Sequence, residues 1–86
     1  MNQPSVHQWV FEHARKTPDA SAVHSADETL CYRELATRIV LASRALRWAG
    51  VEPGDRVLVV LPNVPAAVVL SLALQQLGAV PVEASA

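Results

Sequence analysis

The sequence contains only one cysteine, Cys31, among its 86 residues. A single cysteine excludes an intramolecular disulfide framework and fits a reducing compartment. The N-terminus also lacks the basic start and apolar core of a secretory signal, so we expect a cytoplasmic protein. No feature of the sequence supplies a base for Cys31, and we therefore interpret it as a small buried side chain rather than a nucleophile.

The three histidines form no metal-binding pattern. His7 and His13 are six residues apart, which places them on different sides of a helix, and His24 lies in another segment. No cysteine or carboxylate completes a set with the spacing of a zinc site. We therefore expect no metal site.

Glycines are also few: the chain has three, and neither GxGxxG nor GxxxxGK[ST] occurs. The stretch VLPNVP, residues 60–65, joins a strand to a helix start, where backbone N–H groups can receive an anion. Asn63 is suited to cap that helix itself, and we prefer this interpretation. With no Ser/His/Asp arrangement and no paired carboxylates, the residues predict no catalytic or cofactor-binding site in this chain.

Charged side chains are missing from one long segment, because no Asp, Glu, Lys or Arg lies between Arg56 and Glu83. A membrane span needs about 20 continuous apolar residues, whereas three prolines, Asn63 and Gly78 divide this segment. It therefore predicts a buried strand, helix and strand. The net charge of −1 gives no reason to expect nucleic acid or a membrane surface as a partner.

Hydrophobic residues make up 51% of the chain and charged residues 17%, with a mean hydropathy of +0.22. A domain of this size buries only roughly 60% of the surface that its unfolded chain exposes. An isolated domain also normally needs a charged surface around its core. The chain has more apolar surface than an independent domain can easily hide, which predicts a fragment or a subunit.

The apolar periodicity predicts an α/β fold in a single incomplete domain, residues 1–86. Ser5 can cap a first helix that ends near Lys16, and a polar turn at 25–28 joins two short strands (21–24 and 29–32) in a hairpin. The elements expected after it are a helix over 32–49, a strand over 56–61, a helix over 65–77 and a strand over 79–83. The last three form a βαβ unit with parallel strands.

The helix over 32–49 begins with the spacing of a capping box, Cys31 and Glu34, although a thiol is a weak acceptor where Ser or Thr is usual. Glu34 and Arg38 predict an i,i+4 ion pair. The arginines at 33, 44 and 47 predict a solvated helix face, with a phosphate or an acidic partner as the alternative. The residues expected on the buried face are Leu35, Ile39, Ala42, Leu46 and Ala49.

Two apolar surfaces have no obvious cover in the sequence. Leu41, Ala45 and Trp48 form a second apolar seam on the helix over 32–49, which predicts a docking surface, with ordinary partial burial as the alternative. The helix over 65–77 is apolar nearly all round, and the preceding elements are expected to cover only one of its faces. Leu70 and Leu74 lie on the other face, so we add them to the candidate docking surface.

Four short motifs then occur in a recognisable order: TPDASAV at 17–23, LCYREL at 30–35, GVEPGDRVLVVLPN at 50–63 and LGAVPV at 77–82. They are similar to T-P-D-x-x-A-[VL], L-[ST]-Y-x-E-L, G-[VL]-x-x-G-D-x-V-x-[VIL]-x-[LM]-x-N and [KR]-x-G-[AG]-x-x-[VP] of the adenylate-forming superfamily. That superfamily includes acyl- and aryl-CoA ligases, luciferases and the adenylation domains of nonribosomal peptide synthetases. The resemblance covers residues 6–82.

The resemblance implies that the chain has the fold of the N-terminal portion of these enzymes. It implies a structural part of an ATP-dependent ligase that activates a carboxylic acid as an acyl-adenylate, and LGAVPV looks closer to acyl- and aryl-CoA ligases than to amino-acid adenylation domains. The family's ATP- and Mg-binding motifs lie downstream of this segment, so none of its catalytic residues is carried over. The implied partner is the remainder of the ligase or a complementing subunit. The alternative is a stand-alone interaction module that self-associates.

Overall fold

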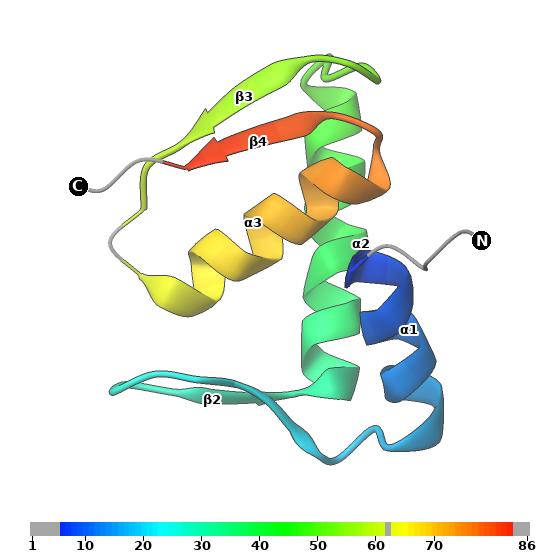
Figure 1. Cartoon of the computed structure of the whole chain (residues 1–86), viewed down its shortest axis with the longest axis vertical. Helices are drawn as coiled ribbons and strands as arrows, with labels where there is room; N and C mark the ends of the chain where they lie inside the picture. The colour runs from blue at the N-terminus through cyan, green and yellow to red at the C-terminus, as the bar shows by residue number, and fades with distance from the viewer. Residues whose placement is uncertain (1–5, 62, 84–86) are drawn as a thin grey trace.

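The computed structural model describes residues 6–61 and 63–83 (Figure 1). The predicted order of helix, hairpin, helix and βαβ unit is confirmed, and the predicted cap at Ser5 lies outside the described residues. The elements are α1 (Val6–Lys16), β1 (Ser21–His24), β2 (Thr29–Cys31), α2 (Tyr32–Trp48), β3 (Arg56–Val59), α3 (Val64–Gln76) and β4 (Val80–Glu83).

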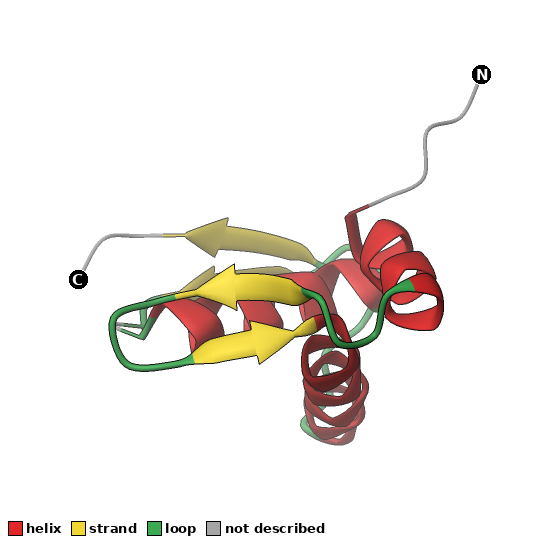
Figure 2. Cartoon of the chain, turned by 90° about the horizontal axis from the view of Figure 1, so that it is seen from below, coloured by secondary structure: helices red, strands yellow, loops and turns green. Residues whose placement is uncertain are grey.

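The described strands form two separate two-stranded sheets. β1 and β2 are antiparallel, as predicted for a hairpin. β3 and β4 are parallel, with Arg56 opposite Val80 and Leu58 opposite Val82, and α3 connects them. α3 lies between this parallel pair and the hairpin (Figure 1). In Figure 2, α1 and α2 lie together at one end of the hairpin, from which β1 and β2 extend.

The larger core lies between α2 and α3 and is closed by α1 and the hairpin. The predicted buried face of α2 is confirmed at Leu35 and Ile39, while Ala42 and Leu46 are half-buried beside them. Ala49 is exposed, contrary to the prediction, because α2 ends at Trp48 and Ala49 only caps it. The buried side chains of this core are Val10, Val23, Leu30, Leu35, Ile39, Val69, Leu72 and Ala73.

A smaller core lies on the other face of α3. Leu74 is fully buried there against Val59 and Ala79, and Leu70 packs half-buried beside them. The expectation that nothing in the chain covers this face is therefore wrong, because β3 and β4 cover it. The helix that connects two parallel strands folds back onto their sheet, and this places its second apolar face inside the molecule.

Two turns before β3 and one hydrogen bond at the start of β4 set the register of the parallel pair. Gly50 adopts φ +99° directly after α2, a conformation that glycine adopts without steric cost, and the N–H of Val51 donates to the Leu46 carbonyl at 3.1 Å. The N–H of Asp55 then donates to the Glu52 carbonyl at 3.1 Å in the predicted turn. The N–H of Val80 donates to the Asp55 carbonyl at 2.7 Å, which starts the pairing of β4 with β3.

Candidate functional site

The corner between β2 and α2 forms the predicted capping box, with the Cys31 side chain facing the N–H of Glu34 and the Glu34 side chain facing the N–H of Cys31. The N–H of Cys31 donates to Glu34 Oε1 at 3.1 Å. This hydrogen bond lowers the pKa of the Glu34 carboxyl below its ordinary value, because it favours the ionised form. Arg38 forms its ion pair with Glu28 at 3.3 Å, and none is found between Arg38 and Glu34 in the described residues, although the charge of Arg38 also lowers the pKa of Glu34.

The histidines are divided between α1 and β1, and His13 packs against aromatic neighbours. His13 stacks on Trp9 with ring centroids 3.8 Å apart, and both rings approach Tyr32, which joins α1 to the start of α2. Partial burial lowers the pKa of His7. Cys31 is half-buried. Within residues 6–61 and 63–83, no three His, Cys, Asp or Glu side chains come together in a group that could hold a metal ion.

The predicted docking residues divide into an exposed and a buried group. Leu41, Ala45 and Trp48 are exposed on one side of α2, Leu41 at 57% and Trp48 at 94%. Their spacing places them in one stripe, which we call the α2 seam. Leu74, by contrast, is fully buried under β3 and β4, and Leu70 is half-buried there. Leu74 therefore takes no part in the surface that a partner meets.

The sequence did not assign a second exposed apolar surface, which lies on β3 and β4. Side chains alternate between the two sides of a strand, and residues paired in a parallel register point to the same side. Val57 and Val59 face α3, while Leu58 faces away from it and is 64% exposed beside its partner Val82. We call the exposed set the outer sheet face; its residues are Leu58, Val60, Val80 and Val82.

A signal for this surface was present in the sequence. The run RVLVVL, residues 56–61, is apolar at both alternating sets of positions, which is typical of a strand covered on two sides. In the structure only the side toward α3 is covered. None of the helices in the described ranges is long and apolar enough to cross a membrane. Apart from Arg56, which pairs with Val80 at the start of β3 and lies on the same side as Leu58, the open face of β3 and β4 is thus apolar like the interior of a protein.

The sequence of this chain is similar to those of known proteins. Residues 10–86 match the family model described as AMP-binding enzyme. A feruloyl-CoA synthase from Amycolatopsis sp is 40% identical over 80 residues, which are 93% of this chain and 16% of that protein. Phenyloxazoline synthase MbtB from Mycobacterium sp. (strain MCS) is 41% identical over 76 residues, which are 88% of this chain and 6% of that protein.

A solved structure shares the fold. The N-terminal subdomain of Klebsiella oxytoca NpsA superposes with a TM-score of 0.88 at 26% sequence identity, covering 96% of this chain and 22% of that one. The chain therefore spans less than a quarter of the length of each of these relatives.

Proposed function

The chain belongs to the AMP-binding enzyme family, and on that premise we propose that it is the structural N-terminal part of an ATP-dependent ligase that activates a carboxylic acid as an acyl-adenylate. Residues 1–86 are then one incomplete domain, the start of the large N-terminal domain of that ligase. The observation that carries the proposal is the match of residues 10–86 to the family model. The curated relatives named above are much longer, and the chain spans 16% of one and 6% of the other.

The outer sheet face supports this proposal on physical grounds. Parallel sheets occur almost only with both faces covered, and they usually contain more strands than two. Here β3 and β4 stand as a pair, with Leu58 and Val82 exposed on the side away from α3. We propose that the remainder of the ligase packs on this face, and that the α2 seam is a second, separate docking contact.

We propose that the corner between β3 and α3 is not a nucleotide site. The connection between β3 and α3 has no glycine, and the N–H of Ala66 at the start of α3 already donates to Asn63 Oδ1 at 3.0 Å. ATP and Mg would therefore be bound by other parts of the ligase. We assign this chain a scaffolding role in the cytoplasm and no step of the reaction.

For the type of ligase, we propose an acyl- or aryl-CoA ligase. The support is LGAVPV at residues 77–82, which is nearer to the pattern of that group, and the feruloyl-CoA synthase relative. The matching phenyloxazoline synthase stands for the alternative, a domain of a peptide synthetase. ATP–pyrophosphate exchange by the complete ligase separates the two types. Exchange with aromatic acids favours the aryl-CoA ligase, and exchange with amino acids favours the domain of a peptide synthetase.

The experiment that tests the proposal begins with the gene beyond codon 86. We expect a continuing frame, or a neighbouring gene, that encodes a Gly-, Ser- and Thr-rich phosphate loop. The downstream polypeptide is then expressed with and without residues 1–86, and ATP–pyrophosphate exchange is measured. We expect exchange only when both parts are present, and none from the 86-residue chain alone.

Two results would contradict the proposal. Exchange by the pure 86-residue chain would show that it contains a nucleotide site. A stop codon followed by genes unrelated to the family would instead favour a stand-alone interaction module, which uses the same exposed surfaces for another partner.

A further inference from the structure

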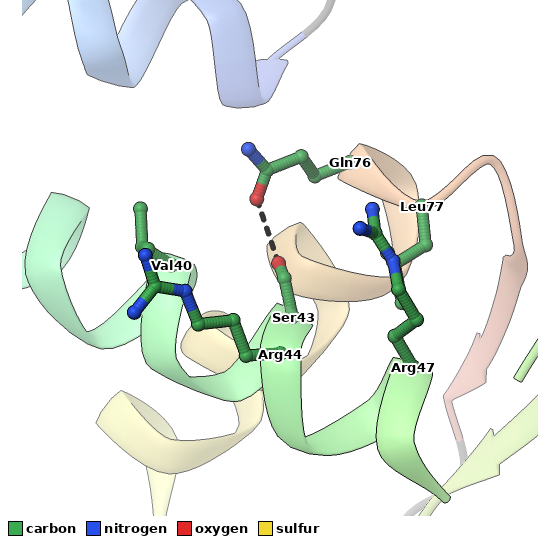
Figure 3. A pocket seen from close by; sticks show the side chains of 6 residues that line it. All are labelled: Val40, Ser43, Arg44, Arg47, Gln76 and Leu77. Atoms are coloured by element: carbon green, nitrogen blue, oxygen red, sulfur yellow. Dashed lines mark hydrogen bonds between the residues drawn. The ribbon is translucent and has the colours of Figure 1, made fainter. Parts of the chain in front are cut away.

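A pocket of about 310 Å³ lies between α2 and α3, at the ends where both helices finish (Figure 3). It faces neither the outer sheet face nor the α2 seam. Its volume is at the lower end of the range for small-molecule sites. The pocket is lined by Val40, Ser43, Arg44, Arg47, Gln76 and Leu77.

The polar groups around the pocket present hydrogen-bond donors. Ser43 is buried, and its hydroxyl lies 2.6 Å from Gln76 Oε1 and 2.8 Å from the Ile39 carbonyl oxygen, either of which can accept its one hydrogen. When the hydroxyl donates to Gln76, the Gln76 amide presents its nitrogen, a donor. The guanidinium groups of Arg44 and Arg47 lie on either side of the Ser43–Gln76 pair (Figure 3).

The two arginines differ from the others on the same helix. Arg33 pairs with Asp19 at 2.9 Å and Arg38 pairs with Glu28 at 3.3 Å. Within the described part of the chain, neither Arg44 nor Arg47 forms an ion pair. Two like charges three residues apart on a helix repel each other, so this arrangement is stabilised by a negative group between them.

The helix ends offset only part of this positive charge. α2 ends at Trp48 and α3 at Gln76, and each C-terminus is equivalent to about half a negative charge. Two guanidinium groups against two such ends leave about one positive charge at the mouth of the pocket. The mouth of the pocket therefore still attracts an anion.

We propose that this pocket binds a dianionic phosphate group, either as the free ion or on a small phosphomonoester. An arginine fork matches a phosphate in two parallel hydrogen bonds. A phosphate has enough oxygen atoms to accept from both forks and from the Gln76 amide at once, whereas a carboxylate has two oxygens. The inference rests on the pocket alone and does not depend on the proposed ligase.

The test is a titration of the 86-residue chain followed through the backbone amide signals of residues 40–47 and 76–77 by nuclear magnetic resonance. The probes are inorganic phosphate and ribose 5-phosphate, with sodium chloride at matched ionic strength and ribose as controls. We expect saturable shifts with both phosphates and none with chloride or ribose. Equal affinities would identify a site for the ion, and tighter binding of ribose 5-phosphate a site for a phosphomonoester.

Three variants locate the site. R44Q and R47Q are each expected to weaken phosphate binding by about tenfold or more, since a hydrogen bond to a charged group is lost. R56Q removes the same charge from an exposed arginine outside the pocket and is expected to leave the affinity unchanged. Equal shifts in all three variants and the unmodified chain, or shifts reproduced by chloride, would overturn the proposal. So would a spectrum without dispersed signals from the chain in its monomeric form, because the pocket requires α2 and α3 to be packed.

Discussion

At the scale of single residues, Cys31 occupies the position where a hydroxyl usually caps a helix. Its backbone is extended, with φ −82° and ψ 168°, as an N-cap requires. Glu34 supplies the other half of the box from three residues further on. The spacing alone predicted this corner, because a capping box is a local arrangement that depends on residue types four positions apart at most.

We predict that Cys31→Ser stabilises the chain by roughly up to 1 kcal/mol, because the hydroxyl is a better acceptor than the thiol for the N–H groups of the first turn of α2. The free energy of unfolding from urea titration measures the change. Cys31→Ala removes the sulfur without adding a cap and serves as the control. A Cys31→Ser chain that is less stable than the unmodified one would mean that packing of the sulfur outweighs the cap.

Glu34 makes a second prediction, on the dependence of stability on pH. Its pKa is lowered in the folded chain, so its contribution is fully present above the ordinary carboxyl pKa and is lost as the pH falls through the lowered value. Glu34→Gln keeps an acceptor for the Cys31 N–H but cannot titrate. We expect this variant to lose less stability than the unmodified chain when unfolding is compared at neutral and at acid pH.

Glu34→Ala is the companion variant, since it removes both the charge and the acceptor. It is expected to be less stable than the unmodified chain at neutral pH and to approach it in acid. Identical pH profiles for the unmodified chain and Glu34→Gln would contradict the account of this corner.

Other residues could not be placed from the sequence because their partners are distant in it. Arg38 was expected to pair within its own helix and instead pairs with Glu28 in the hairpin. Ser43 lies on the buried side of α2, where its hydroxyl is 2.8 Å from the Ile39 carbonyl oxygen. A polar residue among apolar neighbours predicts exposure, and only the packing of α3 against α2 shows why it is inside.

At the scale of elements, the helices and strands were predictable, and the covering of α3 was not. Periodicity showed that α3 is apolar on two sides. It did not show that β3 and β4 lie against the second side, because that contact depends on how the βαβ unit folds back. The uncovered apolar surface was therefore assigned to α3, whereas it lies on the far side of the sheet.

We predict that Leu74→Ala destabilises the chain by about 2–5 kcal/mol, as expected when a fully buried leucine is truncated. Leu70→Ala, one turn earlier in α3 and half-buried, is the matched control and is expected to cost clearly less. Denaturant unfolding of the two variants measures the difference. Equal, small effects would mean that β3 and β4 do not cover this face in solution.

At the scale of the whole molecule, most of the exposed large apolar residues lie on the outer sheet face and the α2 seam, while Val6 and Trp9 lie on α1 and Leu61 and Val64 lie at the corner where α3 begins. A soluble monomer rarely exposes contiguous apolar surface without a partner for it. The motif order was sufficient to recognise the family, since each motif marks a turn or a corner of the fold. The remainder of the proposed ligase could not be inferred from these residues, because the chain spans only 16% of the feruloyl-CoA synthase and 22% of the NpsA subdomain structure.

We predict that the isolated chain forms dimers or larger species at micromolar concentration, because the outer sheet face and the edges of its strands are open. Leu58→Glu places a charge in the middle of this face and is expected to shift the chain toward the monomer in light scattering. Leu41→Glu makes the same change in the α2 seam, at a leucine of similar exposure. A chain that is already monomeric, or that responds only to Leu41→Glu, would contradict this prediction.

The most direct test of the central claim, that the rest of a ligase covers the outer sheet face, is the rate at which a thiol reagent labels Leu58→Cys. The variant is made with Cys31→Ser, so that it carries one thiol, and Asp27→Cys in the exposed hairpin turn is the control. The account predicts rapid labelling of both variants in the isolated chain. When the downstream polypeptide is present, it predicts strong protection of Leu58→Cys and none of Asp27→Cys. Labelling of Leu58→Cys at the same rate with and without the downstream polypeptide would contradict it.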